Sequence, residues 1–470
     1  MSEPDLLRTT VAELAADLRA GRTTAAAVAE VAIARHERLD GTLGAYKVWD
    51  SGRARREAAL ADAALAAGFD LGPFQGLPVS VKDLFGVHGV PTFAGSPKAL
   101  PPSWETEGPV VSALRAGLAT IAGKTHTVEF AYGGLGTNPH WGTPRNPWDA
   151  KHHRAPGGSS AGAGVSLWEG SCVLALGTDT AGSVRIPASL TGNVGLKITA
   201  GRWSTQGIVP LSRTLDTPGV LARTMADTAL AFAVIDPLTD ERPLDLVAAL
   251  AGHEVSTLRV GVCDWFFQDC SPGVAEAVER AIEELSARGM QVQRIEIPEL
   301  DDVIGVFRSG GITASEFAAF VNTELPDWKA TLDPNVLNRF ARMEAVPAVD
   351  YVARIWRLRT LAAEVLARMA PFDLVVGPTV PVTAPAIDDV AAPEAYHAAN
   401  MMALRNTCIA NMLGFSALTM PVGLDAAGMP VGLQLMAAPD QEELLLAGGF
   451  ACERVLGTAA QRLGLPPLCA

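Results

Sequence analysis

The chain has 470 residues, of which 49% are hydrophobic and 19% charged, and this composition excludes a mainly disordered protein. The net charge of −14 has the wrong sign for a protein whose main partners are nucleic acids or anionic lipid surfaces. The length is typical of about three domains or one large one, and we expect one large enzyme-like unit.

The cysteine pattern favours a reducing compartment. The six cysteines form no CxxC pair and no compact, evenly spaced framework of the kind that small secreted domains need. The N-terminus lacks a basic segment followed by an apolar one, and no run of about 18 apolar residues occurs in the chain. We therefore expect a cytoplasmic protein with neither a membrane nor a nucleic acid as a partner.

Residues 10–38 are rich in alanine, and their larger apolar side chains recur at helical spacing. Gly21 interrupts this pattern, and Thr23 or Thr24 is placed to cap the helix that follows. The segment predicts an N-terminal helical hairpin.

Short apolar runs alternate with helical stretches from residue 76 onward. These runs cover residues 77–84, 119–122, 172–176, 258–262, 373–376 and 418–422. Runs this short and this apolar are typical of strands covered on both faces. The pattern predicts an α/β fold in which a mixed, largely central β-sheet is sandwiched between helices.

Two glycine-rich loops, at residues 156–164 and 177–187, flank one apolar strand. Glycines at this density let the backbone approach a bound group and turn its N–H donors inward, so both loops are suited to holding anionic charge. Phosphate binding is one interpretation, but the Lys-Ser/Thr end of a P-loop is absent, as is a dinucleotide-binding fingerprint.

The first loop contains Gly158-Ser159-Ser160-Ala161-Gly162, which fits the G-x-S-x-G pattern of α/β-hydrolases with Ser160 as nucleophile. That mechanism needs an acid and a histidine further along the chain, and the later histidines lie in no evident motif. An esterase that uses Ser160 stays open as an alternative.

Lys82 follows an apolar strand and is expected to point into the protein, where lysine is rare. With this lysine and the two loops, the chain resembles the amidase signature family of Ser-Ser-Lys hydrolases. Further landmarks of that family lie at residues 123–131, 142–148, 195–197 and 428–434. The resemblance implies a single domain over 1–470, with N-terminal helices to residue 65, a signature core at 70–225, a variable substrate-side region at 236–370 and a final part, 371–470, that completes the sheet.

The resemblance makes Ser183 the nucleophile, Ser159 a bridging serine on a cis peptide, and Lys82 the base. A serine hydroxyl is a poor nucleophile until its proton has somewhere to go, and a neutral lysine reached through a second hydroxyl supplies that route. Lys82 must then lose its charge near neutral pH, which requires burial to lower its pKa to about 7–8.

The same resemblance assigns roles around this triad. The expected oxyanion donors are the backbone N–H groups of Thr180, Ala181, Gly182 and Ser183. The stretch expected to border the substrate is Tyr132, Gly133 and Gly134. Asp179 and Arg185 either fix the shape of the second loop or form an ordinary ion pair.

Three further side chains have two interpretations each. Trp141 and Trp203 either line the acyl pocket or belong to the core. His126 is either an acid/base or a hydrogen-bonded structural residue. The methionines Met401, Met402 and Met412 are expected in the core.

Departures from the family pattern favour a stand-alone amidase. His126 replaces the Asn, and Val128 the Asp, that are typical of the glutamine-hydrolysing A subunit of tRNA-dependent amidotransferases. That subunit remains the alternative, with a partner that accepts ammonia. We expect no cofactor and no metal, because the adjacent His152 and His153 cannot share a helix face and no HExxH motif occurs.

The aromatic run Trp265, Phe266 and Phe267 favours an aryl or alkyl primary amide as substrate, and the negative net charge mildly disfavours a strongly anionic one. The sequence then predicts an amidase that forms an acyl-enzyme at Ser183 and releases ammonia. A homodimer is the default assembly.

Overall fold

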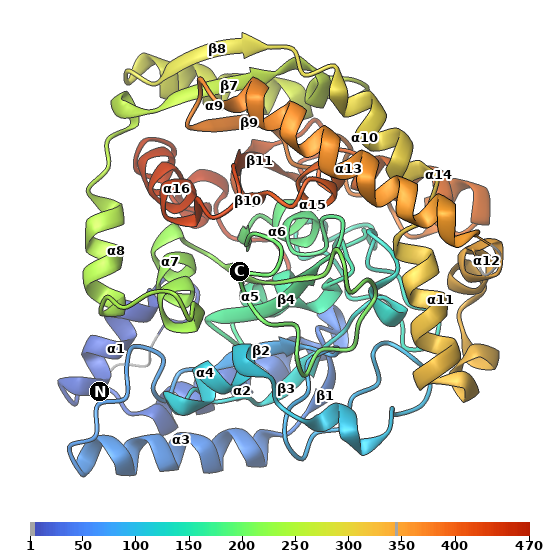
Figure 1. Ribbon diagram of the computed structural model, residues 1–470. Coiled ribbons are helices and arrows are strands. Elements are labelled where there is room, and N and C mark those ends of the chain that lie inside the picture. The colour runs from blue at the N-terminus through green and yellow to red at the C-terminus, as the bar shows by residue number, and fades with distance from the viewer. Residues whose placement is uncertain (1–4, 344–345) are drawn as a thin grey trace.

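An eleven-stranded sheet runs through the middle of the computed structural model, which describes residues 5–343 and 346–470 (Figure 1). From one edge to the other, its strands are β1 (Tyr46–Trp49), β3 (Gly123–Thr125), β2 (Val79–Lys82), β4 (Leu174–Asp179), β6 (Thr217–Ala222), β5 (Val194–Lys197), β10 (Ser416–Leu424), β11 (Pro430–Ala437), β9 (Leu374–Pro378), β7 (Arg259–Cys263) and β8 (Gln291–Ile295). The sheet is mixed, and the predicted fold class is confirmed.

Parallel pairing at two places in the sheet decides where functional residues gather. Strands β3, β2 and β4 are parallel neighbours, as are β9, β7 and β8, whereas the strands between them pair antiparallel. Val81 lies opposite Leu176 in a parallel pair, so the carboxyl ends of β2 and β4 lie side by side at the same end of the strands. Ligands of open α/β sheets bind beyond such carboxyl ends.

Helices cover the sheet because its central strands are apolar on both faces. All residues of β2, β4, β5 and β9 are buried. Helix α5 (Ala161–Glu169) packs against β2 and β4, α7 (Met225–Ile235) against β4 and β6, and α16 (Glu442–Leu456) against β10 and β11. The remaining helices of the first and last parts of the chain are α4 (Pro109–Ala116), α6 (Arg185–Thr191), α14 (Pro393–Leu404), α15 (Cys408–Met412) and α17 (Ala459–Leu463).

The predicted N-terminal hairpin is present as α1 (Val11–Arg19) and α2 (Ala25–Leu43). Thr24 caps α2 by accepting a hydrogen bond from the Ala27 N–H at 3.1 Å. The segment up to residue 65 is not purely helical, however, because strand β1 lies between α2 and α3 (Ser51–Ala66) and forms the edge of the sheet.

The strand expected at residues 119–122 begins at Gly123 instead. Gly123 pairs with Trp49, and a side chain at this position would come within 2.1 Å of the Val48 carbonyl oxygen. Residues 119–122 are buried extended chain that leads into β3, with one isolated bridge between Pro78 and Thr120.

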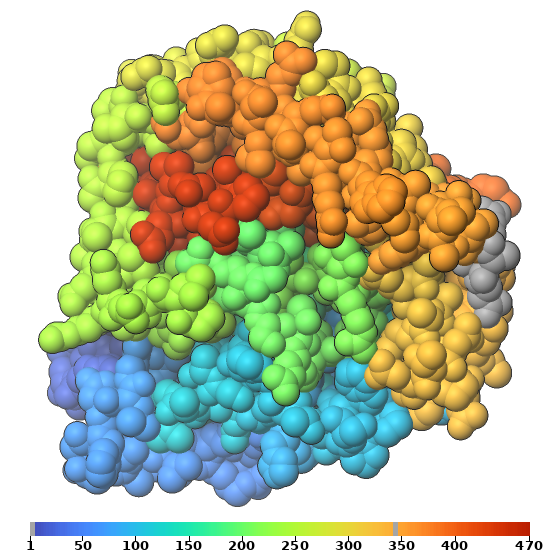
Figure 2. Space-filling model, in the orientation of Figure 1, coloured from blue at the N-terminus to red at the C-terminus, as the bar shows by residue number. Residues whose placement is uncertain are grey.

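The variable region contributes the edge strand β8, its neighbour β7 and a group of helices. Its helices are α8 (Pro243–Ala251), α9 (Val274–Ala287), α10 (Glu299–Arg308), α11 (Thr313–Glu324), α12 (Pro334–Met343) and α13 (Ala348–Met369). In the space-filling view, α11 and α12 stand at one side of the molecule (Figure 2). Residues 1–4 and 344–345, parts of the predicted N-terminal and variable regions, lie outside the described residues.

Two findings bear on the cellular compartment and the membrane contact expected from the sequence. All six cysteines are free thiols. Within the two described ranges, no helix combines the length and the apolar character that a membrane span requires.

Candidate active site

Lys82 ends strand β2 and is completely buried. Its Nζ donates hydrogen bonds to the Oγ of Ser159 and to the Oγ1 of Thr178, each at 2.7 Å. Burial lowers the pKa of Lys82 to about 7, although the negative charges of Asp216 and Asp179 act in the opposite direction. The amine therefore loses its proton near neutral pH, in agreement with the sequence argument.

Ser159 lies just before helix α5, and the peptide bond that joins it to Gly158 is cis. The next residue, Ser160, is fully buried and does not line the cavity described below. Its Oγ–H donates to the carbonyl oxygen of Ser183 at 2.6 Å. Ser160 thus holds the second loop in place, and its geometry does not support the alternative in which it is the nucleophile.

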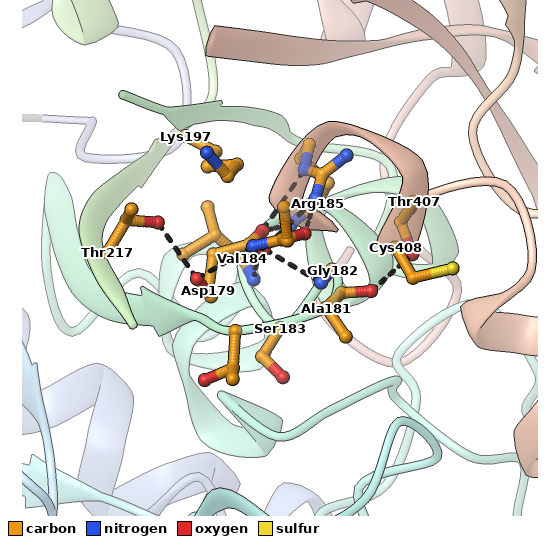
Figure 3. A network of polar contacts seen from close by, with 12 residues as sticks. Asp179, Ala181, Gly182, Ser183, Val184, Arg185, Lys197, Thr217, Thr407 and Cys408 are labelled. Atoms are coloured by element: carbon orange, nitrogen blue, oxygen red, sulfur yellow. Dashed lines mark hydrogen bonds and ion pairs between the residues drawn. The ribbon is translucent and has the colours of Figure 1, made fainter. Parts of the chain in front are cut away.

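Asp179, the last residue of β4, holds the loop that carries Ser183 (Figure 3). Its carboxylate accepts hydrogen bonds from the N–H groups of Gly182 at 2.7 Å and Val184 at 3.1 Å. The Arg185 side chain also donates to both of its oxygens, at 3.0 and 3.1 Å. The Nδ2 of Asn411 adds a bond at 2.8 Å. The carboxylate therefore determines the path of the chain on both sides of Ser183.

Asp179 stays ionised although it is fully buried. Burial raises its pKa, but the charge and hydrogen bonds of Arg185 outweigh that effect and hold the pKa at about 2. Arg185 is equally buried and also donates to Gln434 and Asn411, each at 2.6 Å. Both interpretations of Asp179 and Arg185 apply, because the two residues form an ion pair and also fix the shape of the loop.

One predicted oxyanion donor needs correction. The N–H of Gly182 is bonded to Asp179, which removes it from the set available to a substrate. The N–H groups of Thr180, Ala181 and Ser183 have no partner among the described residues. These three are the donors that remain for a developing oxyanion.

Gly182 is required at its position for another reason. Its φ is 130°, a conformation that side-chain-bearing residues rarely adopt. An added Cβ would also lie 2.1 Å from the Oγ1 of Thr407. The backbone therefore turns at Gly182 in a way that no other residue permits without a shift.

Ser183 opens onto a cavity of about 170 Å³. Thr180, Ala181, Tyr132 and Gly133 line it as well, in line with the sequence analysis. The third residue of the predicted substrate stretch, Gly134, does not: its N–H donates to the Oδ1 of Asn400 at 2.7 Å. Gly134 orients a lining side chain instead of touching the cavity.

Much of the remaining lining comes from residues that sequence reasoning missed. They belong mainly to the end of α10, the start of α11, α12 and α14, and include Phe307, Arg308, Ile312, Arg339, His397 and Met401. Met412 is buried in the core as expected and also lines the cavity, whereas Met401 lines the cavity and, like Met402, is only partly buried. The aromatic run Trp265–Phe267 contributes no lining residue; Phe266 is fully buried in the core.

The other side chains with two interpretations lie away from the cavity lining. The Nε1 of Trp141 donates to the Ser96 carbonyl oxygen at 2.8 Å, and that of Trp203 to Asp236 at 2.9 Å. Burial, with a smaller contribution from Lys47, lowers the pKa of His126 to about 4. Trp203 therefore belongs to the core, whereas Trp141 is exposed and fits neither interpretation; His126 is buried away from the cavity lining.

Asp216, which precedes β6, is a further residue missed by the motifs. It accepts a hydrogen bond from the Oγ1 of Thr180 at 2.5 Å and from the N–H groups of Leu211 and Ser212 at 2.9 and 3.0 Å. Burial raises its pKa to about 6. It comes to the site because β6 pairs antiparallel with β4, which brings Thr217 opposite Asp179.

The hydroxyl groups of Ser159 and Ser183 are not joined by a hydrogen bond in this structure, and the Ser183 hydroxyl has no partner among the described residues. Catalytic hydrogen bonds are often long without substrate and tighten when it binds. The structure thus assembles Lys82 with Ser159 and, separately, directs Ser183 into the cavity.

A group of potential metal ligands lies elsewhere. His36, Asp40 and Glu169 place ligand atoms within 4.8 Å of one another. His36 is already in contact with the Glu169 carboxylate at 3.3 Å, and none of the three lines the cavity.

The chain is similar to known proteins over most of its length. The family model described as Amidase matches residues 27–446. A 2-amino-5-chloromuconic acid deaminase from Comamonas testosteroni is 50% identical, over 97% of this chain and 98% of its own. The A subunit of a glutamyl-tRNA(Gln) amidotransferase from Streptomyces coelicolor is 32% identical, over 89% of this chain and 90% of its own. A crystal structure of an amidase, 31% identical, superposes with a TM-score of 0.84, over 96% of this chain and 100% of its own.

Proposed function

The chain belongs to the amidase family of amide-hydrolysing enzymes, and on that basis we propose that it cleaves a carbon–nitrogen bond with Ser183 as nucleophile, Ser159 as relay and Lys82 as base. The observation that carries this proposal is the contact of 2.7 Å between Lys82 Nζ and Ser159 Oγ. The amine there is buried and has a pKa of about 7, so it can accept a proton at neutral pH.

In the first half of the reaction, the Oγ of Ser183 attacks the carbonyl carbon of the amide. Its proton passes to Ser159, whose own proton passes to the neutral amine of Lys82. The oxygen of the substrate gains negative charge, which the N–H groups of Thr180, Ala181 and Ser183 can stabilise.

In the second half, the carbon–nitrogen bond breaks and the nitrogen takes back the proton from Lys82 through Ser159, so that ammonia leaves and the acyl group remains as an ester of Ser183. A water molecule then attacks this ester with the same base. Its oxygen ends in the carboxylate product, and the Ser183 hydroxyl is restored.

We propose that the chain works without a partner that accepts ammonia. The relative that is 50% identical across nearly the whole chain is named as a deaminase, whereas the amidotransferase relative is 32% identical. His126 and Val128, which depart from the residues typical of the amidotransferase, also favour a stand-alone enzyme.

The name of the deaminase relative suggests a second candidate function. Deamination would release ammonia from an amino-bearing carbon of an unsaturated acid. Water adds across the double bond, its oxygen to the amino-bearing carbon and a proton to the neighbouring carbon; ammonia then leaves with the hydroxyl proton and an oxo group remains. Such a carbon yields no ester with Ser183. The mass of acid-quenched enzyme separates the two reactions, because only amide hydrolysis adds an acyl group to the peptide that contains Ser183.

Ammonia release by the purified chain tests the proposed function. The panel contains arylacetamides, aliphatic amides, urea-like amides, amino-substituted unsaturated acids and glutamine. Ser183→Ala serves as the blank, and Ser309→Ala is the matched control, because Ser309 lines the same cavity but its Oγ–H donates to the Val306 carbonyl oxygen. We expect release that disappears only in Ser183→Ala. Equal release by wild type and Ser183→Ala would overturn the assignment.

A cytoplasmic location and a homodimer remain predictions from the sequence. The six free thiols support the first.

A further inference from the structure

Two arginines are among the residues that line the cavity. Arg308 ends α10 and Arg339 lies on α12, and both line the cavity that also contains Ser183. No aspartate or glutamate is among the described lining residues. The cavity is therefore positively charged, in contrast to a chain whose net charge is −14.

Among the described residues, no carboxylate forms an ion pair with Arg308 or Arg339, whereas most arginines on the surface of this protein are paired, as Arg213 is with Glu324 at 2.7 Å. An arginine that lines a cavity without a carboxylate partner keeps its donors available for an anion that enters.

Arg339 is also held in position. Its Nη1 donates to the carbonyl oxygen of Tyr132 at 2.8 Å, and its guanidinium carbon lies 5.0 Å from the centre of the Tyr132 ring and 5.8 Å from that of Tyr396. Tyr132 lines the cavity next to the Ser183 loop. One bond and two aromatic rings thus fix the guanidinium, while Nε and Nη2 have no partner among the described residues.

We propose that Arg339 and Arg308 bind a carboxylate of the substrate, so that the enzyme is specific for anionic acids that carry the scissile carbon–nitrogen bond at a distance from that carboxylate. Arg339 is the fixed anchor, because the free edge of its planar guanidinium, Nε and Nη2, matches a carboxylate with two parallel hydrogen bonds. Arg308 lines the same cavity, is exposed and adds attraction for an anion.

This proposal rests on the proposed function only for the position of the scissile bond. It reverses the expectation that an acidic chain disfavours anionic substrates, because the charge that a substrate meets is that of the cavity and not that of the whole surface. Hydrolysis at Ser183 and recognition at the arginines can also be tested separately.

Binding measured by calorimetry in a Ser183→Ala background tests the proposal without turnover. The probes are trans,trans-muconate, a rigid dicarboxylate, and muconamide, its neutral diamide of the same shape. We expect muconate to bind at least ten times more tightly than muconamide. Arg339→Gln should remove most of this preference and Arg308→Gln part of it, whereas Arg213→Gln, which changes an exposed and paired arginine, should leave it unchanged.

Two variants, Arg308→Gln and Arg339→Lys, show whether a lost preference for muconate reflects a lost contact or a misfolded protein. The side chain of Arg308 forms no hydrogen bond with a described residue. Lysine at position 339 keeps the charge and can still donate to Tyr132 but loses the planar fork. An intermediate preference in Arg339→Lys supports the proposal. Equal binding of muconate and muconamide would overturn it, as would a preference that survives in a folded Arg308→Gln/Arg339→Gln double variant. Neither result would bear on ammonia release at Ser183, so a failure of the proposed carboxylate recognition is distinguishable from a failure of the proposed function.

Discussion

The Nζ of Lys82 lies 2.7 Å from the Oγ of Ser159 and forms no ion pair with any described carboxylate. An amine in this position accepts a proton only in its neutral form, and its pKa of about 7 makes that form abundant at physiological pH. The rate constant for attack should therefore rise as the pH rises through about 7 and level off above it.

Lys82→Ala tests this dependence. We expect kcat/KM to fall at least about 100-fold at pH 7, the lower end of the usual contribution of a general base. The loss should be smaller at pH 9–10, because hydroxide partly replaces the amine. Kinetics from pH 5 to pH 10 check both statements. A defect of the same size at every pH would assign Lys82 a structural role.

The same lysine makes stability depend on pH. Its pKa in the folded chain lies below its ordinary value of 10.5, so between about pH 7 and 10.5 the unfolded chain binds more protons. The free energy of unfolding should therefore rise with pH across that window. Lys82→Met removes the buried amine and should stabilise the fold more at pH 6 than at pH 10, as measured by urea denaturation. The exposed Lys151→Met should show no such difference.

Asp179→Asn should affect stability and activity together. It leaves Arg185 buried without its counter-ion, which typically costs about 3–5 kcal/mol, and it weakens the bonds that shape the loop at Ser183. Glu324→Gln, which breaks an exposed pair, should cost less than about 1 kcal/mol. Urea denaturation of both variants measures the contrast, and equal losses would contradict the account.

Asp179 also makes the free energy of unfolding depend on pH, but here the folded chain favours the charged form of the side chain, whereas it favours the neutral form of Lys82. Its pKa is held at about 2, below the ordinary 3.8, so its contribution to stability is present above about pH 4 and lost as the pH falls toward 2. Asp179→Asn should lack this part of the acid sensitivity.

Gly182→Ala should lower kcat while leaving most of the fold intact. The added methyl group would meet Thr407 at 2.1 Å on a backbone with φ of 130°, and the donors on either side of it would shift. Gly201→Ala is the matched control, because its φ of 86° is also positive but nothing lies within 4 Å of the added atom. We expect at least a tenfold loss in the first variant only. Comparable activity of the two variants would speak against a role for this turn.

The parts of the site that lie in one stretch of sequence can be predicted. Lys82 is recognisable because a charged residue ends an apolar strand, and Ser159 and Ser183 because they lie in glycine-rich loops that resemble a known family. The alternation of apolar runs and helices predicts the mixed sheet correctly. Its register at 119–125 does not follow from that alternation, because the start of β3 depends on a close approach of β1 to Gly123.

The substrate wall could not be predicted in the same way. Arg308 and Arg339 lie on helices more than 100 residues beyond Ser183, in a region without a motif, and only the packing of that region beside the loop brings them to the cavity. The aromatic residues at 265–267 are suited to a pocket by composition, but their apolar surface is used in the core. Charge in a cavity is a property of the tertiary structure and does not follow from net charge.

Ser160→Ala separates the two serine interpretations. Loss of the bond from Ser160 Oγ to the Ser183 carbonyl oxygen loosens the loop, so a decrease of no more than about tenfold is expected, in keeping with one hydrogen bond. Ser183→Ala should reduce turnover to the level of the blank. Complete inactivation by Ser160→Ala in a folded protein would favour the esterase mechanism.

The most direct test of the central claim is covalent labelling with a serine-directed phosphonate, followed by peptide mapping. The account predicts a single adduct on Ser183, formed faster as the pH rises through about 7, and no adduct in Ser183→Ala. An adduct on Ser160, or labelling of Ser183→Ala at the rate of the wild type, would contradict it.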